Sequence, residues 1–315
     1  MTAPGMVAGA GSSRRAVDSG WWSRALANNA PGYLFLLPWL IGFLGLTIGP
    51  IVTSFYLSFT NFDLLTAPNW VGADNYIRMF TNDPKFLASM RVTLFFVIFS
   101  VPLKLAFALG VALLLNRGMK GLPVYRALFY LPSLLGASVA IAILWRQLFA
   151  GDGVVNQFLA PFAIVGPSWI SNPRFSLWTL IILSIWQFGS PMIIFLAGLR
   201  QIPQDMYEAA SLEGAGKWRV FWKITLPMLT PVVFFNAIIQ TIEAFKSFTP
   251  AFIISAGTGN PINSTLFYTL YLYQEAFGYF RMGYASALAW FLLLLVACFT
   301  AFSFLTSKYW VHYDD

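Results

Sequence analysis

Six long apolar runs constrain the fold of this chain more than any other feature of its sequence. A helix needs about 20 predominantly apolar residues to cross the hydrocarbon core of a bilayer. The runs lie at Tyr33–Phe59, Thr93–Leu115, Leu128–Phe149, Leu177–Leu199, Met228–Ser255 and Ala285–Thr306. Hydrophobic residues make up 58% of the chain, more than a soluble domain normally carries. The sequence therefore predicts an all-α integral membrane protein with six transmembrane helices within residues 31–306.

The distribution of Lys and Arg predicts the orientation of these spans. Eleven lie in segments on the side of both termini and six on the other side. Because Lys and Arg accumulate in cytoplasmic loops, we expect a multi-pass protein whose residues 1–30 and 307–315 are both cytoplasmic tails. The net charge of +7 then reflects topology and contact with anionic membrane lipid. The basic residues are spread over separate loops, so we expect no nucleic-acid partner.

The outer connection Ala256–Gly283 is rich in aromatic residues. We expect a short amphipathic helix around Leu266–Phe277 there, at a receptor-facing surface or in a plain aromatic belt at the membrane interface.

The residue types needed for catalysis are sparse. His312 is the only histidine and Cys298 the only cysteine, so no Cys/His metal cluster and no intrachain disulfide can form. The segment Gly214-Ala215-Gly216-Lys217-Trp218 is superficially like a phosphate loop. It lacks the earlier glycine and the Ser or Thr after the lysine. We therefore expect a chain that is not an enzyme and binds no cofactor, metal or ATP itself.

Residues 201–227 form a charged segment between two apolar runs. Pro203 suits the first turn of a helix, and acidic residues follow it near the positive end of the helix dipole. The small side chains of Ala209, Ala210 and Ser211 let another protein pack closely against this helix. Gly214 and Gly216 allow the chain to turn after it. Aromatic and basic residues then alternate as in a helix at the membrane surface. This segment predicts a docking surface with an acidic tip.

A polar stripe runs along the fifth span. Asn236, Gln240, Glu243 and Ser247 recur at steps of four, three and four, which places them on one helix face. Such a stripe at membrane depth faces a cavity or another helix. Its amides, carboxylate and hydroxyl could hydrogen-bond a sugar beside Trp186, Gln187 and the ring of Phe245, or they could bond a partner subunit. Lys246 could neutralise Glu243, and Lys104 could lie on the cavity wall or pair elsewhere.

The loop also carries a family signature. Glu208-Ala209-Ala210, three residues, Gly214, nine residues and then Ile224-Thr225-Leu226-Pro227 resemble the EAA motif of the membrane subunits of binding-protein-dependent ABC importers. Further segments are similar to the carbohydrate-uptake branch of that family, among them Val71–Tyr76, Ala197–Pro203 and Arg281–Ala287. Within the branch, the chain resembles the first-type permease of maltose or glycerol-3-phosphate systems.

This resemblance implies a type I (MetI-like) importer permease in a bacterial or archaeal cytoplasmic membrane. It implies a heterodimer with a second permease subunit, a cytoplasmic ATPase dimer that binds ATP and Mg, and an extracytoplasmic solute-binding protein. It assigns ATPase coupling to Glu208, Ala209, Ala210, Ser211 and Gly214, with Glu208 meeting a basic residue of the ATPase. The implied substrate is a disaccharide or oligosaccharide, with a monosaccharide, a polyol or a glycerol phosphodiester as alternatives.

Two other protein classes remain open from the residues alone. Glu243 and Lys104 within apolar runs are also typical of a proton- or sodium-coupled secondary transporter. An integral-membrane transferase is a third class, and the sequence offers it no catalytic cluster.

Overall fold

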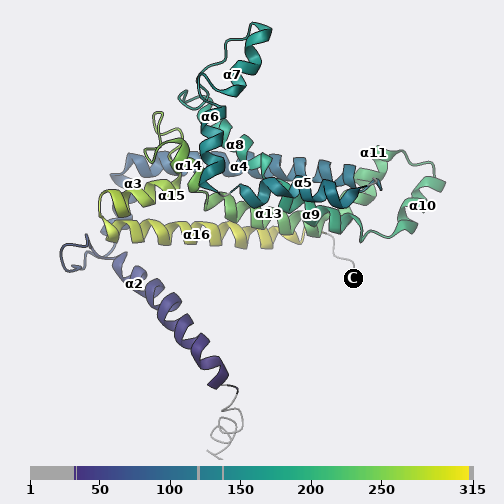
Figure 1. Ribbon diagram of the computed structural model, residues 1–315. Coiled ribbons are helices and arrows are strands. Elements are labelled where there is room, and N and C mark those ends of the chain that lie inside the picture. The colour runs from purple at the N-terminus through teal and green to yellow at the C-terminus, as the bar shows by residue number, and fades with distance from the viewer. Residues whose placement is uncertain (1–31, 33, 119–120, 137, 312–315) are drawn as a thin grey trace, which may run out of the picture. The chain divides into compact units, whose positions relative to one another are not determined.

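The computed structural model describes residues 32, 34–118, 121–136 and 138–311 (Figure 1). These residues form helices joined by turns, with one isolated antiparallel bridge between Thr60 and Trp70. The chain divides into two units, residues 1–54 and residues 55–315. The predicted tail of residues 1–30 and the end of the other tail, residues 312–315, lie outside the described residues.

The first predicted span is an apolar helix over Leu34–Leu57, with a mean hydropathy of 2.0. Its 24 residues are enough to cross a bilayer. The helix includes a π-helical stretch, η1 (Phe43–Ile48), and continues as α2 (Gly49–Leu57).

The larger unit holds three further long apolar helices and two bent helix pairs. The long helices are α4 (Pro84–Leu115), the stretch Thr230–Ile254, in which a short break separates α13 (Thr230–Phe245) from α14 (Thr249–Ile254), and α16 (Met282–Ser307). The bent pairs are α5 (Leu122–Leu135) with α6 (Val139–Leu148), at 95°, and α8 (Ser176–Trp186) with α9 (Gly189–Leu199), at 43°. By length and composition, the described residues thus hold four candidate spans, or up to six when each bent pair counts as one, the number that the sequence predicts.

Helix α4 is central to the larger unit and packs against α8, α9 and α13 (Figure 1). It begins at Pro84, nine residues before the apolar run from which the span was predicted. The reason is its cap: the Asp83 carboxylate accepts the Phe86 N–H at 3.0 Å, and Pro84 at the first helical position has no N–H to leave unpaired. Two apolar core clusters lie along α4, one containing Phe96 and Val101 and the other containing Ala108 and Ala112.

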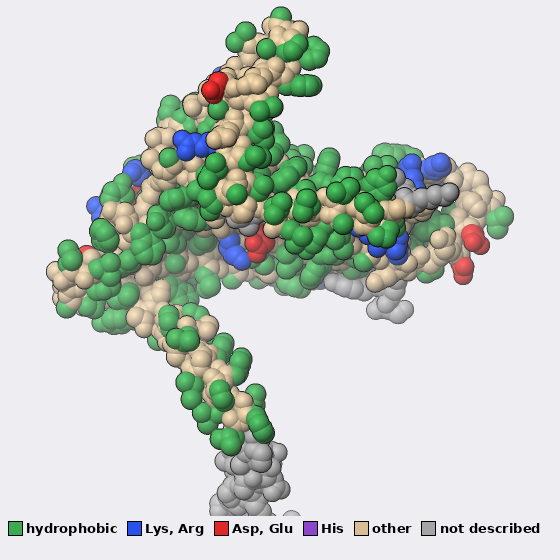
Figure 2. Space-filling model, in the orientation of Figure 1, with side chains coloured by type: hydrophobic (Ala, Val, Ile, Leu, Met, Phe, Trp, Pro, Cys, Tyr) green, Lys and Arg blue, Asp and Glu red, His purple; other side chains and the backbone are tan. Residues whose placement is uncertain are grey.

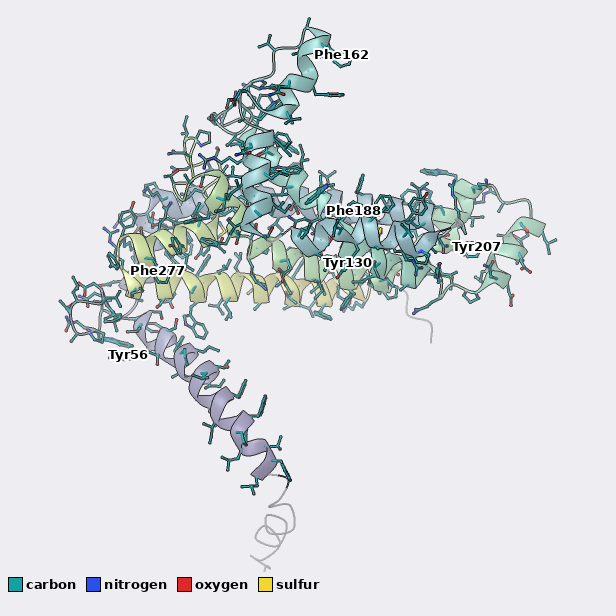
Figure 3. The ribbon with its side chains drawn as sticks, in the orientation of Figure 1. Tyr56, Tyr130, Phe162, Phe188, Tyr207 and Phe277 are labelled. Carbon is teal, nitrogen blue, oxygen red and sulfur yellow. The ribbon has the colours of Figure 1, made fainter. Side chains whose placement is uncertain are left out.

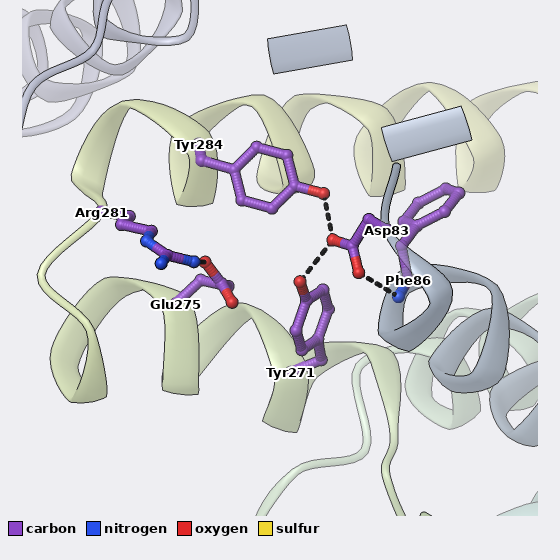
Figure 4. Close-up of polar contacts among 6 residues, drawn as sticks. All are labelled: Asp83, Phe86, Tyr271, Glu275, Arg281 and Tyr284. Carbon is purple, nitrogen blue, oxygen red and sulfur yellow. Dashed lines mark hydrogen bonds and ion pairs between the residues drawn. The ribbon is translucent and has the colours of Figure 1, made fainter. Parts of the chain in front are cut away.

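The Asp83 carboxylate also joins three helices (Figure 4). It accepts hydrogen bonds from the hydroxyls of Tyr271 in α15 (Tyr268–Tyr273) and Tyr284 in α16. Beside it, Arg281 forms an ion pair with the buried Glu275 at 3.3 Å. Glu275 lies in the π-helical stretch η4 (Gln274–Gly278), and Arg281 lies in the connection between η4 and α16. These contacts fix the start of α4 against the connection between the last two spans.

The expected surface helix around Leu266–Phe277 is mostly core. Helix α15 does form there, but Leu266, Tyr268 and Tyr271 are at most 1% exposed and belong to the larger apolar cluster. Tyr268 packs against α4 and α16, whereas Tyr273 and Phe277 are exposed, so the helix has one buried and one exposed face as expected of an amphipathic helix; its role at a receptor-facing surface or in an aromatic belt stays a prediction.

The other connections carry short helices. They are α3 (Asp74–Thr81), α7 (Val154–Leu159), η2 (Ala160–Phe162), α10 (Gln204–Leu212), α11 (Lys217–Val220), η3 (Phe221–Thr225) and α12 (Leu226–Met228). In α3, the Asn75 amide donates to the Ser58 and Thr60 carbonyls at 2.9 and 2.8 Å and so fixes this connection.

Candidate functional site

A polar cavity of about 360 Å³ lies among the spans of the larger unit. Its wall includes residues from three helix breaks: Gly136 between α5 and α6, Gln187 between α8 and α9, and Lys246, Ser247 and Phe248 between α13 and α14. Interrupted transmembrane helices expose backbone and polar groups where they line a cavity, and substrate sites of transporters are built at such breaks. The convergence of three breaks makes this cavity the candidate site.

Gln187 shows how the packing positions a polar side chain at this site. Its amide Nε2 donates to the Gly136 carbonyl at 2.9 Å, and the Ser133 hydroxyl donates to the Gln187 carbonyl at 3.0 Å. A Cβ atom at Gly136 would lie 2.3 Å from the Gln187 side chain, so glycine permits this close approach. A Cβ atom at Gly189 would lie 2.6 Å from the Phe129 carbonyl oxygen, so α5 and α9 also approach closely here.

The same helix contact brings large side chains close to the break. Phe188 lies in the break, directly before α9, and Tyr130 lies in α5, both in the middle of the larger unit (Figure 3). Phe188 is buried against Phe129, with ring centroids 6.0 Å apart. The break between α8 and α9 is therefore held by packing on one side while Gln187 reaches the cavity on the other.

The predicted polar stripe divides into two parts. Gln240, Glu243 and Ser247 line the cavity, as does Gln187. Asn236 does not: it is fully buried, and its amide atoms have no hydrogen-bond partner among the described residues.

Two predicted aromatic residues also point elsewhere. Trp186 packs against Trp145, with ring centroids 5.9 Å apart, and Phe245 is buried against Phe299. Neither lines the cavity. The sequence placed Trp186 within the fourth predicted span but could not tell which way its ring would turn.

The charged groups at the cavity, within the described part of the chain, are Lys104, Lys246 and Glu243. Lys246 Nζ lies 3.0 Å from Oε1 of Glu243, as the sequence allowed. Lys104 comes from α4, between the two apolar clusters, and lies on the cavity wall. Figure 2 shows basic and acidic side chains together in the middle of a mostly hydrophobic face. In the described ranges, no group of three or more His, Cys, Asp or Glu side chains is placed to hold a metal ion.

The second candidate region is the loop around α10. The helix begins at Gln204, with Pro203 as its cap residue and Asp205 in its first turn. It ends in a Schellman motif: the Gly214 N–H donates to the Ser211 carbonyl at 3.1 Å and the Ala215 N–H to the Ala210 carbonyl at 2.9 Å. Gly214 has a φ of +73°, the left-handed conformation that this motif needs. The predicted turn at Gly214 is confirmed.

The outer surface of α10 is free to meet another protein. Glu208, Ala209, Ser211 and Gly214 are exposed, whereas Ala210 is 7% exposed and faces inward. The acidic side chains gather over α10 at one end of the view in Figure 2. The Tyr207 hydroxyl lies 3.2 Å from the Thr225 hydroxyl and links α10 to η3, where the loop joins the next span (Figure 3).

Sequence reasoning missed several cavity residues. Ser133, Gly136, Ser184 and Ser190 line the wall, yet each is a small residue in an apolar run. The signal that could have found them is the interruption itself: Pro132, Gly136 and Gly189 are helix-breaking residues in the middle of predicted spans.

Comparison with known proteins places this geometry in a family. Residues 94–309 match the model of the binding-protein-dependent transport system inner membrane component. The chain is 54% identical to the probable ABC transporter permease protein YesP of Bacillus subtilis (strain 168), over 91% of this chain and 94% of that protein. It is 32% identical to the lactose transport system permease protein LacF of Rhizobium radiobacter, over 88% of this chain and 94% of that protein.

A solved structure shares the fold. The bacterial alginate ABC transporter in complex with an alginate pentasaccharide-bound periplasmic protein contains a chain that matches 92% of this one and 98% of its own length, with a TM-score of 0.78 and 21% identity. Together with the family match and the relatives, this fold settles the class: the chain belongs to the binding-protein-dependent transport system inner membrane components, the permease subunits of ABC importers.

Proposed function

We propose that this chain is the first-type permease subunit of an ATP-driven saccharide importer, and that it forms half of the translocation path. The observation that carries the proposal is the polar cavity at the three helix breaks. Interior polar groups in membrane spans are costly and are retained where they line a pathway. In this proposal Gln187, Gln240, Glu243 and Ser247 belong to the substrate path.

The chemistry of the cavity supports a saccharide as substrate. Amide and hydroxyl groups of Gln187, Gln240, Ser184 and Ser190 can each donate and accept hydrogen bonds with sugar hydroxyls. The cavity volume of about 360 Å³ falls in the range of small-molecule sites. The lactose transport system permease among the relatives supports the same class. We favour a disaccharide or oligosaccharide.

The exposed face of α10 supports coupling to an ATPase. In this proposal both termini are cytoplasmic, α10 docks on a cytoplasmic ATPase dimer that binds ATP and Mg, and a second permease completes the path. An extracytoplasmic binding protein delivers the saccharide. Closure of the ATPase dimer can bias the permease between its inward- and outward-facing states only if it holds α10 differently in its open and closed forms. The Schellman turn and the Tyr207–Thr225 contact would transmit that movement to the span that starts after η3.

The test is charge reversal at the tip of α10. Glu208 is exposed, and the described residues offer it no ion pair, so Glu208→Lys should leave the fold intact. We expect it to weaken docking of the ATPase by on the order of 2–5 kcal/mol, as when one partner of a charge pair at an interface is removed. The measurement is co-purification of the ATPase with the tagged chain, followed by ATP hydrolysis stimulated by the loaded binding protein.

Asp152 provides the matched control. It is exposed in the connection between α6 and α7, away from α10 in the sequence, and Asp152→Lys makes the same change of charge. Asp152→Lys should co-purify the ATPase normally, and an acidic substitution of the facing basic residue of the ATPase should restore docking of Glu208→Lys. Normal co-purification and normal hydrolysis with Glu208→Lys would show that α10 touches something else.

A further inference from the structure

The cavity carries one more positive than negative charge. Among the described residues, its charged lining consists of two lysines, Lys104 and Lys246, and one carboxylate, Glu243. Lys246 and Glu243 form an ion pair at 3.0 Å, so they neutralise each other. Lys104 makes no hydrogen bond or ion pair with any described residue; it interacts with Glu243 electrostatically, and one cation of the wall remains in excess of the single carboxylate.

Lys104 is also in an unusual place for a lysine. It lies in the middle of α4, an apolar helix whose mean hydropathy over its membrane window is 2.2. An ammonium group at membrane depth is costly unless it meets water or a negative charge. Lysine and arginine near helix ends can extend to the membrane surface, but a residue twenty positions after Pro84 and eleven before Leu115 is far from both ends. The position of Lys104 therefore places a cation on the cavity wall, where water or an anionic ligand can meet it.

The rest of the cavity wall is uncharged. Its other polar residues are Ser133, Ser184, Gln187, Ser190, Gln240, Ser247 and Thr249, and its apolar residues include Phe96 and Phe248. These side chains suit the hydroxyls and the ring faces of a sugar. A ligand that matches the whole wall is thus a saccharide with many hydroxyls and a net negative charge.

We propose that the transported saccharide is acidic, and that Lys104 binds its carboxylate. This inference rests on the proposed function and narrows it to a substrate class such as uronic-acid oligosaccharides. A lysine ammonium is a point charge with three donors on a flexible stem, so it can follow a carboxylate through a path without fixing one orientation. Glu243 also acts electrostatically on Lys104, and its pair with Lys246 offsets part of the repulsion between the Glu243 carboxylate and an anionic substrate.

The first experiment uses the complete importer in vesicles: this chain, the second permease, the ATPase and the binding protein. The probe is an equal mixture of neutral and uronic-acid oligosaccharides from digests of starch, cellulose, xylan and pectin, and mass spectrometry identifies what accumulates with ATP. Accumulation of carboxylate-bearing saccharides is the expected result. Accumulation of neutral saccharides alone overturns this inference and leaves the proposed function intact. If no saccharide accumulates, the proposed function fails as well.

The second experiment assigns the role to Lys104. We expect Lys104→Met to reduce uptake of the acidic saccharide at least tenfold and to change uptake of its carboxyl methyl ester by less than twofold. Lys104→Arg should retain most uptake of the acid. Lys85→Met removes a lysine that lies outside the cavity and is the matched control. An equal loss for acid and ester, or loss of the second permease on co-purification, would show that Lys104 pairs with protein and would overturn the assignment.

Discussion

Lys246 Nζ lies 3.0 Å from Oε1 of Glu243, at the point where α13 ends and the cavity begins. Both side chains are more than half exposed, at 58% and 61%, so water screens the pair. Such exposed pairs contribute roughly 0.2–1 kcal/mol to the free energy of unfolding. The pair therefore matters for the charge of the cavity more than for stability.

Breaking this pair should change transport and leave stability nearly unaltered. In Lys246→Met, the Glu243 carboxylate loses its partner and faces the cavity alone, so we expect uptake to fall several-fold. The double variant Glu243→Gln, Lys246→Met removes both charges and should recover part of that loss. Uptake and thermal unfolding of the purified complex are measured for both single variants and the double variant. A drop in stability much larger than the range for exposed pairs would show that the pair is structural.

Gln240 and Asn236 form a matched pair on the same helix. Gln240 lines the cavity, whereas Asn236 is fully buried away from it. We expect Gln240→Leu to lower uptake at subsaturating saccharide, because it removes donors and acceptors from the path. Asn236→Leu should preserve uptake and keep or raise the unfolding temperature, because an unpaired buried amide costs about 1–3 kcal/mol. Unchanged uptake in Gln240→Leu would remove that residue from the site.

The stripe shows what the sequence could and could not establish. Helical spacing placed Asn236, Gln240, Glu243 and Ser247 on one face, and the last three do line the cavity. The spacing shows which face of the helix a residue lies on. It does not show how far along that face the cavity extends. Asn236 lies two turns into α13, where neighbouring side chains cover that face completely, and the cavity opens only near the break after Phe245.

The start of α4 is set by capping residues that can be recognised in the sequence. Asp83-Pro84 is a strong start for α4, yet the apolar run alone placed the start of that span at Thr93. The two tyrosine hydroxyls that bind the Asp83 carboxylate belong to residues 188 and 201 positions away, so no local pattern could have predicted those two bonds. Lys104 was visible as a lysine in an apolar run, but its place on the cavity wall depends on the packing of α4 against other spans.

Gly214 and Gly216 test the shape of the loop at α10. Both have open space where a Cβ atom would lie, but Gly214 has a φ of +73° while Gly216 has an ordinary φ of −68°. Gly214→Ala should therefore raise the free energy of this left-handed turn by about 1–2 kcal/mol and weaken ATPase coupling. Gly214→Pro should weaken it further, since proline also lacks the N–H that donates to Ser211. Coupling is measured as hydrolysis stimulated by the loaded binding protein. Equal coupling of Gly214→Ala and Gly216→Ala would contradict the role of the Schellman turn.

Tyr271 should make the complex sensitive to alkali. It lies in the connection between the last two spans, where burial and its hydrogen bond to the Asp83 carboxylate raise the pKa of the phenol. Its neutral form is thus favoured by folding, so its contribution to stability is present below the ordinary tyrosine pKa of about 10 and is lost as the pH rises above it.

The variant that checks this is Tyr271→Phe. It should lower the unfolding temperature at neutral pH, because Asp83 loses one donor, and it should also flatten the fall in stability between about pH 9 and 11. Thermal unfolding of the purified complex across this range gives both results. If the unfolding temperature falls equally with rising pH in Tyr271→Phe and in the unaltered protein, other groups cause the sensitivity to alkali.

ATP-dependent accumulation of a labelled saccharide in vesicles tests the central claim most directly. Vesicles contain this chain with the second permease and the ATPase, ATP and Mg are supplied on the ATPase side, and the loaded binding protein is added on the other side. We predict accumulation against a gradient only when all components are present, with no uptake and no ATP hydrolysis by this chain alone. Uptake by the chain alone that is driven by a proton or sodium gradient and is unaffected by ATP would contradict the account.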